Sequence, residues 1–156
     1  MNPEAVRQAE ARLRRADRHV QILSALVGFD ELEEAWCGFL SNAHTVSVKL
    51  QRGTHGHPRS LLWYSRLARD RKSDPLLQYI HQARNADEHN LSPTLILVGK
   101  TGVLQPAENR GDAYAPPGEH LGTALDDATP AHVAKLGSNY LYSIVNDAKR
   151  LIQRGQ

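Results

Sequence analysis

Apolar residues recur at intervals of three and four positions through most of the chain, which is the period of an α-helix. Residues 3–27 carry a stripe that consists of Val6, Ala9, Leu13, Ala16, Val20, Leu23 and Val27. After Gly28, residues 30–52 carry a second stripe that consists of Leu32, Trp36, Phe39, Leu40, Ala43, Val46 and Leu50. The pattern predicts two long amphipathic helices, and we expect the large side chains of Trp36 and Phe39 to anchor the core.

Three further segments show the same period. Residues 58–72 predict a helix whose inward face consists of Leu61, Leu62, Tyr64, Leu67 and Ala68. A fourth helix is predicted over 74–90, because Asp74 can cap it and Pro75 suits its first position. Residues 129–154 carry an apolar stripe so broad that we expect this helix either at the centre of a bundle or shared with a second subunit.

The segment 91–128 has a different character. Short aliphatic runs on either side of Gly99–Gly102 predict a small β-hairpin, and the rest is rich in proline and glycine. We expect this segment to be an ordered but irregular insert. The fold class predicted for residues 1–156 is therefore mainly α: a single domain built as an antiparallel bundle of about five helices, with a small β-hairpin or irregular insert before the last helix.

The composition is that of a globular protein and does not indicate a particular function. The chain has 156 residues, of which 40% are hydrophobic and 23% are charged, and its formal net charge is +2. That charge permits RNA binding but does not argue for it. The one cysteine, Cys37, excludes an internal disulfide, the charged N-terminus does not resemble a signal peptide, and the longest aliphatic run, 95–98, is too short to span a membrane. We expect a cytoplasmic protein without membrane contact.

Two short motifs resemble a phosphate-binding loop and a metal site, but each lacks a residue that such a site requires. Gly99-Lys100-Thr101 matches the end of a phosphate-binding loop, but Thr94 stands where the loop requires its first glycine. His55 and His57 could bind a metal, but a metal site needs at least a third protein ligand and none lies nearby in the sequence. No metal and no cofactor is expected.

The stretch from Arg84 to His89, with the sequence Arg-Asn-Ala-Asp-Glu-His, carries the chemistry. The planar guanidinium of Arg84 can bind a phosphate, and the imidazole of His89 can take up or release a proton near neutral pH. Five residues apart in an unbroken helix, the two side chains are about 140° apart in rotation. We therefore expect a fraying last turn that lets His89 swing round. Asn85 faces His89 from four residues away and could orient the imidazole or the substrate.

This Arg-Asn-x-x-x-His sequence, late in a predicted helix of a small helical domain, resembles the signature of the HEPN superfamily. The resemblance implies a helical bundle, usually a homodimer, that cuts RNA without a metal. It implies that Arg84 and His89 are catalytic, that Asn85 fills the family's polar position after the arginine, and that the protein is a toxin or antiphage effector with an antitoxin or regulatory partner. The resemblance covers the motif and, loosely, the helices; the insert 91–128 has no counterpart in it.

Other interpretations of the motif remain open. The bare spacing also occurs at Arg14 and His19 and at Arg52 and His57, although only Arg84 is followed by a polar residue of the expected kind. A HEPN-like module that binds a partner without catalysis would keep the same residues. The motif could also be a coincidence in a plain helical bundle, with Arg84 paired to Glu88 one turn later.

The rest of the surface adds an RNA-binding hypothesis. The helix at 58–72 has five basic residues against one acidic residue: Arg59, Arg66, Arg69, Arg71 and Lys72. They are candidates for RNA phosphate contacts, and an ordinary solvated face is an equally good interpretation. His44 is expected to be a partly buried structural histidine, with a lesser chance of lining the site. Because His89 supplies one proton-transfer group and cleavage benefits from two, we expect a homodimer in which both motif helices face one groove.

Overall fold

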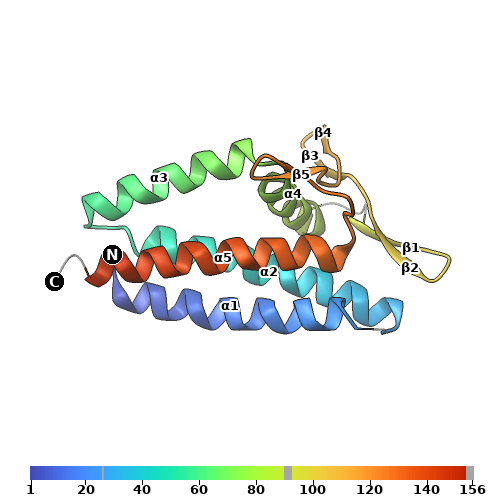
Figure 1. Cartoon of the computed structure of the whole chain (residues 1–156), viewed down its shortest axis with the longest axis horizontal. Coiled ribbons are helices and arrows are strands. Elements are labelled where there is room, and N and C mark those ends of the chain that lie inside the picture. Colours follow the sequence, from blue (N-terminus) through green and yellow to red (C-terminus); the bar gives the residue numbers. More distant parts are fainter. Residues whose placement is uncertain (26, 90–92, 154–156) are drawn as a thin grey trace.

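The structure is a computed structural model that describes residues 1–25, 27–89 and 93–153. Over this part of the chain it contains five helices, α1 (Pro3–Leu23), α2 (Phe29–Arg52), α3 (Pro58–Ser73), α4 (Pro75–His89) and α5 (Pro130–Gln153), with short strand pairs before α5. The mainly helical fold predicted from the sequence is confirmed. Figure 1 shows α1, α2 and α5 side by side along the long axis, with the strand pairs at one end.

The helix boundaries differ from the prediction chiefly at the end of the first helix. α1 ends at Leu23 rather than at 27, with Ser24 as its C-cap residue, and the Ser24 hydroxyl donates to the carbonyl of Val20 at 2.8 Å. The chain then has to reverse direction before Gly28, the extended N-cap residue of α2. The predicted final residues of the fourth and fifth helices, 90 and 154, lie outside the described residues, as do 91 and 92 at the start of the predicted insert.

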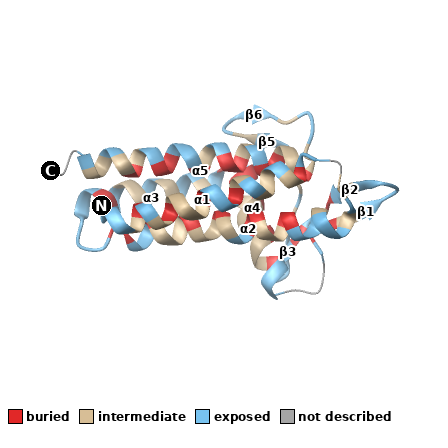
Figure 2. Cartoon of the chain, turned by 90° about the horizontal axis from the view of Figure 1, so that it is seen from below, coloured by how far each residue is buried: buried red, intermediate tan, exposed pale blue. Residues whose placement is uncertain are grey.

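The core lies between α1, α2, α4 and α5, and Figure 2 shows buried residues along their facing sides. Trp36 and Phe39 are fully buried and their rings stack with centroids 6.0 Å apart, which confirms them as anchors. α5 buries its apolar stripe within the chain, with residues Val133, Ala134, Leu141, Ile144, Val145 and Ala148. Of the two expectations for the last helix, the central position in the bundle is the one observed.

The third helix is less buried than predicted. Leu61 and Leu62, expected inward, are 55% and 59% exposed, and Ser60 is the one buried residue among those described in α3. Tyr64 and Leu67, predicted inward, are partly buried against the core together with Trp63, and Ala68 is also half-buried. The prediction was therefore wrong only for Leu61 and Leu62, and polar residues such as Ser60 and Arg71 lie on the covered side.

The segment before α5 forms three antiparallel hairpins, each of two strands joined by a two-residue loop: β1 (Leu95–Val98) with β2 (Thr101–Leu104), β3 (Ala107–Asn109) with β4 (Asp112–Tyr114), and β5 (Glu119–His120) with β6 (Thr123–Ala124). The first is the hairpin predicted around Gly99–Gly102. The other two give regular structure to a segment that was expected to be irregular.

Side chains of α4 hold the hairpin segment against the bundle. Asp74, before the helix, caps it by accepting from the Leu77 N–H at 2.9 Å, and it also accepts from the Leu121 N–H at 2.6 Å. One turn into the helix, the Tyr79 hydroxyl donates to the carbonyl of Gln105 at 2.7 Å. The position of the hairpins is therefore fixed by the same helix that carries the Arg84–His89 motif.

Candidate active site

The motif helix continues without fraying to His89, so the two predicted catalytic side chains leave α4 in different directions. His89 is exposed in the last helical position. Arg84 is 20% exposed, and its Nη2 forms an ion pair with Glu88 Oε1 at 2.5 Å. The expectation that a loosened last turn would bring His89 round to Arg84 is not met, because the helix is intact. The alternative pairing of Arg84 with Glu88 is observed.

His89 instead lines a polar groove together with Asn85 and His81. The three residues are spaced four apart, so they lie in a row along one face of α4. The opposite wall is the β3–β4 hairpin, which contributes Asn109, Arg110, Asp112 and Tyr114, and the groove has a volume of about 460 Å³. Arg84 does not belong to its lining. The structure thus brings together two of the three predicted catalytic residues, Asn85 and His89.

A chain of amide contacts connects the two walls. Asn109 Nδ2 donates to Gln82 Oε1 at 2.7 Å, which fastens the hairpin to α4. Asn85 Nδ2 lies 3.4 Å from the same Gln82 oxygen and 3.5 Å from His81 Nε2. On its other side, Asn85 Oδ1 accepts from Arg84 Nη1 at 3.3 Å. Asn85 is therefore the residue that links the groove to the Arg84 guanidinium.

Behind the groove, His81 stacks on His44 of α2 with ring centroids 6.3 Å apart. Burial, followed by the positive charge of Arg71, lowers the pKa of His81 to about 4, and burial also lowers the pKa of His44. A neutral His81 with an unprotonated Nε2 accepts the Asn85 N–H. The lowered pKa of each ring disfavours its positively charged form in the folded protein. His44 is partly buried, as expected.

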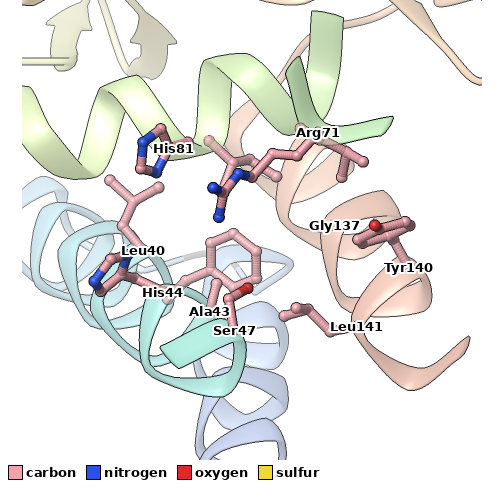
Figure 3. A pocket seen from close by; sticks show the side chains of 12 residues that line it. Leu40, Ala43, His44, Ser47, Arg71, His81, Gly137, Tyr140 and Leu141 are labelled. Carbon is pink, nitrogen blue, oxygen red and sulfur yellow. The ribbon is translucent and has the colours of Figure 1, made fainter. Parts of the chain in front are cut away.

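These two rings border a second, smaller cavity of about 50 Å³ between α2, α3, α4 and α5 (Figure 3). Its floor is apolar and includes Phe39, Leu40 and Leu141. Figure 3 shows the guanidinium of Arg71 extending over it toward His81. The apolar floor and small volume suit helix packing rather than a nucleotide, and the side chain of Arg71 lies in the bundle between α2, α4 and α5.

The basic residues of α3 therefore lie in two different environments, the solvent and the interior of the bundle. Four of the five predicted RNA contacts are exposed to solvent: Arg59, Arg66, Arg69 and Lys72. Arg71, the fifth, faces the cavity between the helices. An external RNA phosphate can approach the four exposed residues directly, whereas Arg71 would have to leave its present surroundings.

Six residues that line the groove were missed from the sequence: His81, Gln82, Asn109, Arg110, Asp112 and Tyr114. His81 was within reach of prediction, because it precedes Asn85 by one helical turn and belongs to the row that Asn85 and His89 form. Arg110 and Asn109 lie in a hairpin more than twenty positions along the chain, and their place opposite α4 follows from the Gln82 contact.

In the described parts of the chain no three His, Cys, Asp or Glu side chains cluster as a metal site would require, and no helix there combines the length and apolar character needed to cross a membrane.

Comparison of the chain with protein-family models, curated protein sequences and solved structures finds no significant match. The resemblance to the HEPN superfamily therefore rests on Arg84, Asn85 and His89 and on the helical fold.

Proposed function

We propose that the protein is a metal-independent endoribonuclease of the HEPN toxin or antiphage-effector type. The observation that carries the proposal is the row of His81, Asn85 and His89 along one wall of a polar groove that is open to solvent. A single RNA strand laid in this groove would meet an exposed imidazole beside an amide that is already hydrogen-bonded in place. Single-stranded RNA is the form whose backbone is free to adopt the geometry needed for cleavage.

The proposed reaction uses the RNA as its own nucleophile. His89 removes the proton from a 2′-hydroxyl, and the 2′-oxygen attacks the adjacent phosphorus. The bond from phosphorus to the 5′-oxygen of the next nucleotide breaks, and that oxygen leaves with a proton. The products are a 2′,3′-cyclic phosphate and a 5′-hydroxyl. Asn85 orients the imidazole or the phosphate, four residues from His89 on the same face.

Arg84 supplies positive charge in this proposal by exchanging partners. It is paired with Glu88, but its Nη1 already contacts Asn85 at the edge of the groove. A phosphate bound beside Asn85 would compete with the Glu88 carboxylate for the guanidinium, and the charge that develops in the transition state strengthens that competition. Arg84 would thus stabilise the phosphate oxygens only when a substrate is present.

We propose further that the enzyme acts as a homodimer. A second proton-transfer group is needed for the leaving oxygen, and His81 is two helical turns from His89, about 12 Å along the axis. His81 is therefore too distant to serve the same phosphate, whereas His89 of a second copy could. The stripe of α5 is already covered within the chain, so the contact has to use other surface close to His89.

The exposed basic residues of α3, Arg59, Arg66, Arg69 and Lys72, would hold the RNA outside the groove through its phosphates. Arg71 was included with them from the sequence, and its role in binding would require it to turn outward. An RNA-cleaving protein also needs restraint in the cell that makes it, so a regulatory partner such as an antitoxin is part of the proposal.

The test is cleavage of a single-stranded RNA in EDTA by wild-type protein and by His89→Ala. Wild type should cut the RNA, leave 2′,3′-cyclic ends and spare the matching DNA, which lacks the 2′-hydroxyl. His89→Ala should lose at least a hundredfold in rate with unchanged helicity. His55→Ala, in an exposed loop, is the matched control and should cut normally. Full cleavage by purified His89→Ala would reject the mechanism.

One observation favours a second candidate, a HEPN-like module that binds a partner without catalysis. The Arg84–Glu88 ion pair occupies the guanidinium that catalysis would use. A binding module would show no cleavage by wild type under any condition that supports RNA binding. It would still retain a partner protein or RNA in a manner sensitive to substitutions along the groove.

A further inference from the structure

The turn of the β3–β4 hairpin contains an arginine in an unfavourable backbone conformation. Asn109 pairs with Asp112, so Arg110 and Gly111 are the two loop residues, with φ of 52° and 89°. Positive φ at both central positions defines a type I′ turn, in which asparagine, aspartate or glycine is strongly preferred at the first position. An arginine there has a steric cost that the rest of the structure must offset.

A second turn of the same kind provides a comparison. In the β5–β6 hairpin, Leu121 and Gly122 have φ of 48° and 77°. There the left-handed backbone has a local explanation, because it aims the Leu121 N–H at Asp74 Oδ2, and the side chain itself is 67% exposed. The side chain of Arg110, by contrast, lines the groove.

The turn that carries Arg110 is held over α4. Ala107 at the start of β3 is fully buried, and Asn109 donates to Gln82. Arg110 therefore reaches the groove from the wall opposite Asn85 and His89. It is exposed, and among the ion pairs found in the described residues none includes it. Asp112 also lines the groove and is the acidic group there that opposes an anion.

We propose that Arg110 is the phosphate-binding residue of the groove, so that a single RNA strand runs between α4 and the β3–β4 hairpin with a phosphate held between Arg110 and His89. The inference deepens the proposed ribonuclease activity and rests on it. Arginine suits the task because its planar guanidinium binds two phosphate oxygens at once. It provides from the hairpin the free cation that α4 does not present, since Arg84 is paired with Glu88.

The test is Arg110→Asn, which should change stability and RNA binding in opposite directions. Asparagine tolerates the left-handed conformation, so the melting temperature should rise by about 2 °C. The affinity for a single-stranded RNA methylated on every 2′-oxygen, which cannot be cleaved, should fall roughly tenfold. The slope of log affinity against log salt concentration should become shallower by about one, as expected for the loss of one phosphate contact.

Two matched controls separate charge from backbone strain. Lys100→Asn removes one positive charge from the exposed two-residue loop of the β1–β2 hairpin, where Lys100 does not line the groove. It should weaken RNA binding less than twofold. Leu121→Asn relieves the other left-handed turn without a change of charge. It should raise the melting temperature as Arg110→Asn does and leave RNA binding unchanged.

Asp112→Asn provides a test in the opposite sense. Removing the acidic group of the groove should tighten binding of the methylated RNA by about threefold. If Arg110→Asn binds the RNA as wild type does, or loses no more affinity than Lys100→Asn, the assignment of Arg110 is overturned. That result would leave a His89-dependent cleavage intact, whereas cleavage that persists in His89→Ala overturns the ribonuclease proposal itself.

Discussion

His44 on α2 and His81 on α4 stack with their ring centroids 6.3 Å apart, at the back of the candidate groove and at the edge of a small apolar cavity. Arg71 and Arg84 lie close enough to both rings to disfavour their protonation, and Glu88 is the acidic group that opposes this effect at His44. The pair therefore makes the packing of α2 against α4 sensitive to acid.

Stability should fall as the pH drops from about 6.5 to about 4. Burial, with Arg71 next, lowers the pKa of His81 to about 4, so between these values the unfolded chain binds a proton that the folded chain does not. The loss should be on the order of 2 kcal/mol and complete near pH 4. Urea unfolding at a series of pH values measures it. In His81→Gln the same interval should be flatter, and an equally steep decline there would contradict the prediction.

Glu88→Gln should strengthen RNA binding. The substitution removes the carboxylate that occupies Arg84, so the guanidinium becomes free for a phosphate, and the affinity should rise by about three- to tenfold. Stability should change by less than about 1 kcal/mol, because both side chains are partly exposed. The control is Asp147→Asn, which breaks the helix-surface pair with Arg150. Equal effects of the two substitutions on RNA binding would mean that only overall charge matters.

Asp74→Ala should lower the free energy of unfolding by about 2–3 kcal/mol, because the buried N–H of Leu77 and the partly buried N–H of Leu121 lose their acceptor. Burial alone would raise the pKa of Asp74, but those N–H donors and His120 outweigh it and the net pKa is lowered. The contribution of the charge is therefore present above pH 3.8 and is lost as the pH falls further, below the interval of His81.

Asp74→Asn is the informative partner variant, because its amide oxygen can still accept one N–H without carrying a charge. It should lose less stability than Asp74→Ala at pH 7 and show no decline of its own below pH 3.8. Chemical unfolding of both variants, followed by circular dichroism, makes the comparison. Equal losses in the two variants would show that the charge, rather than the cap, holds the hairpin.

Cys37 should react slowly with thiol reagents in the folded protein. Burial, and a hydrogen bond from its Sγ to Asp87 Oδ1 at 3.0 Å, raise the pKa of the thiol to about 12, so little thiolate exists at pH 8. Labelling should be at least tenfold faster in denaturant, and faster in folded Asp87→Asn than in wild type. A burst of labelling in the native protein would contradict the prediction.

The helices were predictable because their apolar stripes are long and regular, as in the Trp36–Leu50 part of α2. The end of α1 was missed because the apolar spacing continues to Val27, although the helix itself ends at Leu23. On α3, Tyr64 and Leu67 were assigned inward correctly, but Leu61 and Leu62 are exposed, because the apolar pattern does not reveal how much of the helix the rest of the chain covers. A helix at the edge of a bundle leaves that choice to tertiary packing.

The candidate site was predictable on one wall only. The row on α4 follows from spacing, and the pairing of Arg84 with Glu88 was foreseen as the alternative to catalysis. The opposite wall depends on a contact between Gln82 and Asn109, which are 27 positions apart. The residues next to Arg110 in the sequence do not indicate that it lines a groove, since Arg110 before Gly111 is typical of an ordinary turn.

Two of the contacts that hold the hairpins use main-chain atoms of the insert: Tyr79 donates to the Gln105 carbonyl, and Asp74 accepts from the Leu121 N–H. The β3–β4 hairpin is held through a side chain instead, because Asn109 donates to Gln82. The two residues of its turn, Arg110 and Gly111, take no part in these contacts, so they can change without moving the hairpin as long as Asn109 is kept. One wall of the groove is exchangeable in this sense, so grafting different turns between β3 and β4 offers a way to alter which molecules the groove accepts while the bundle stays the same.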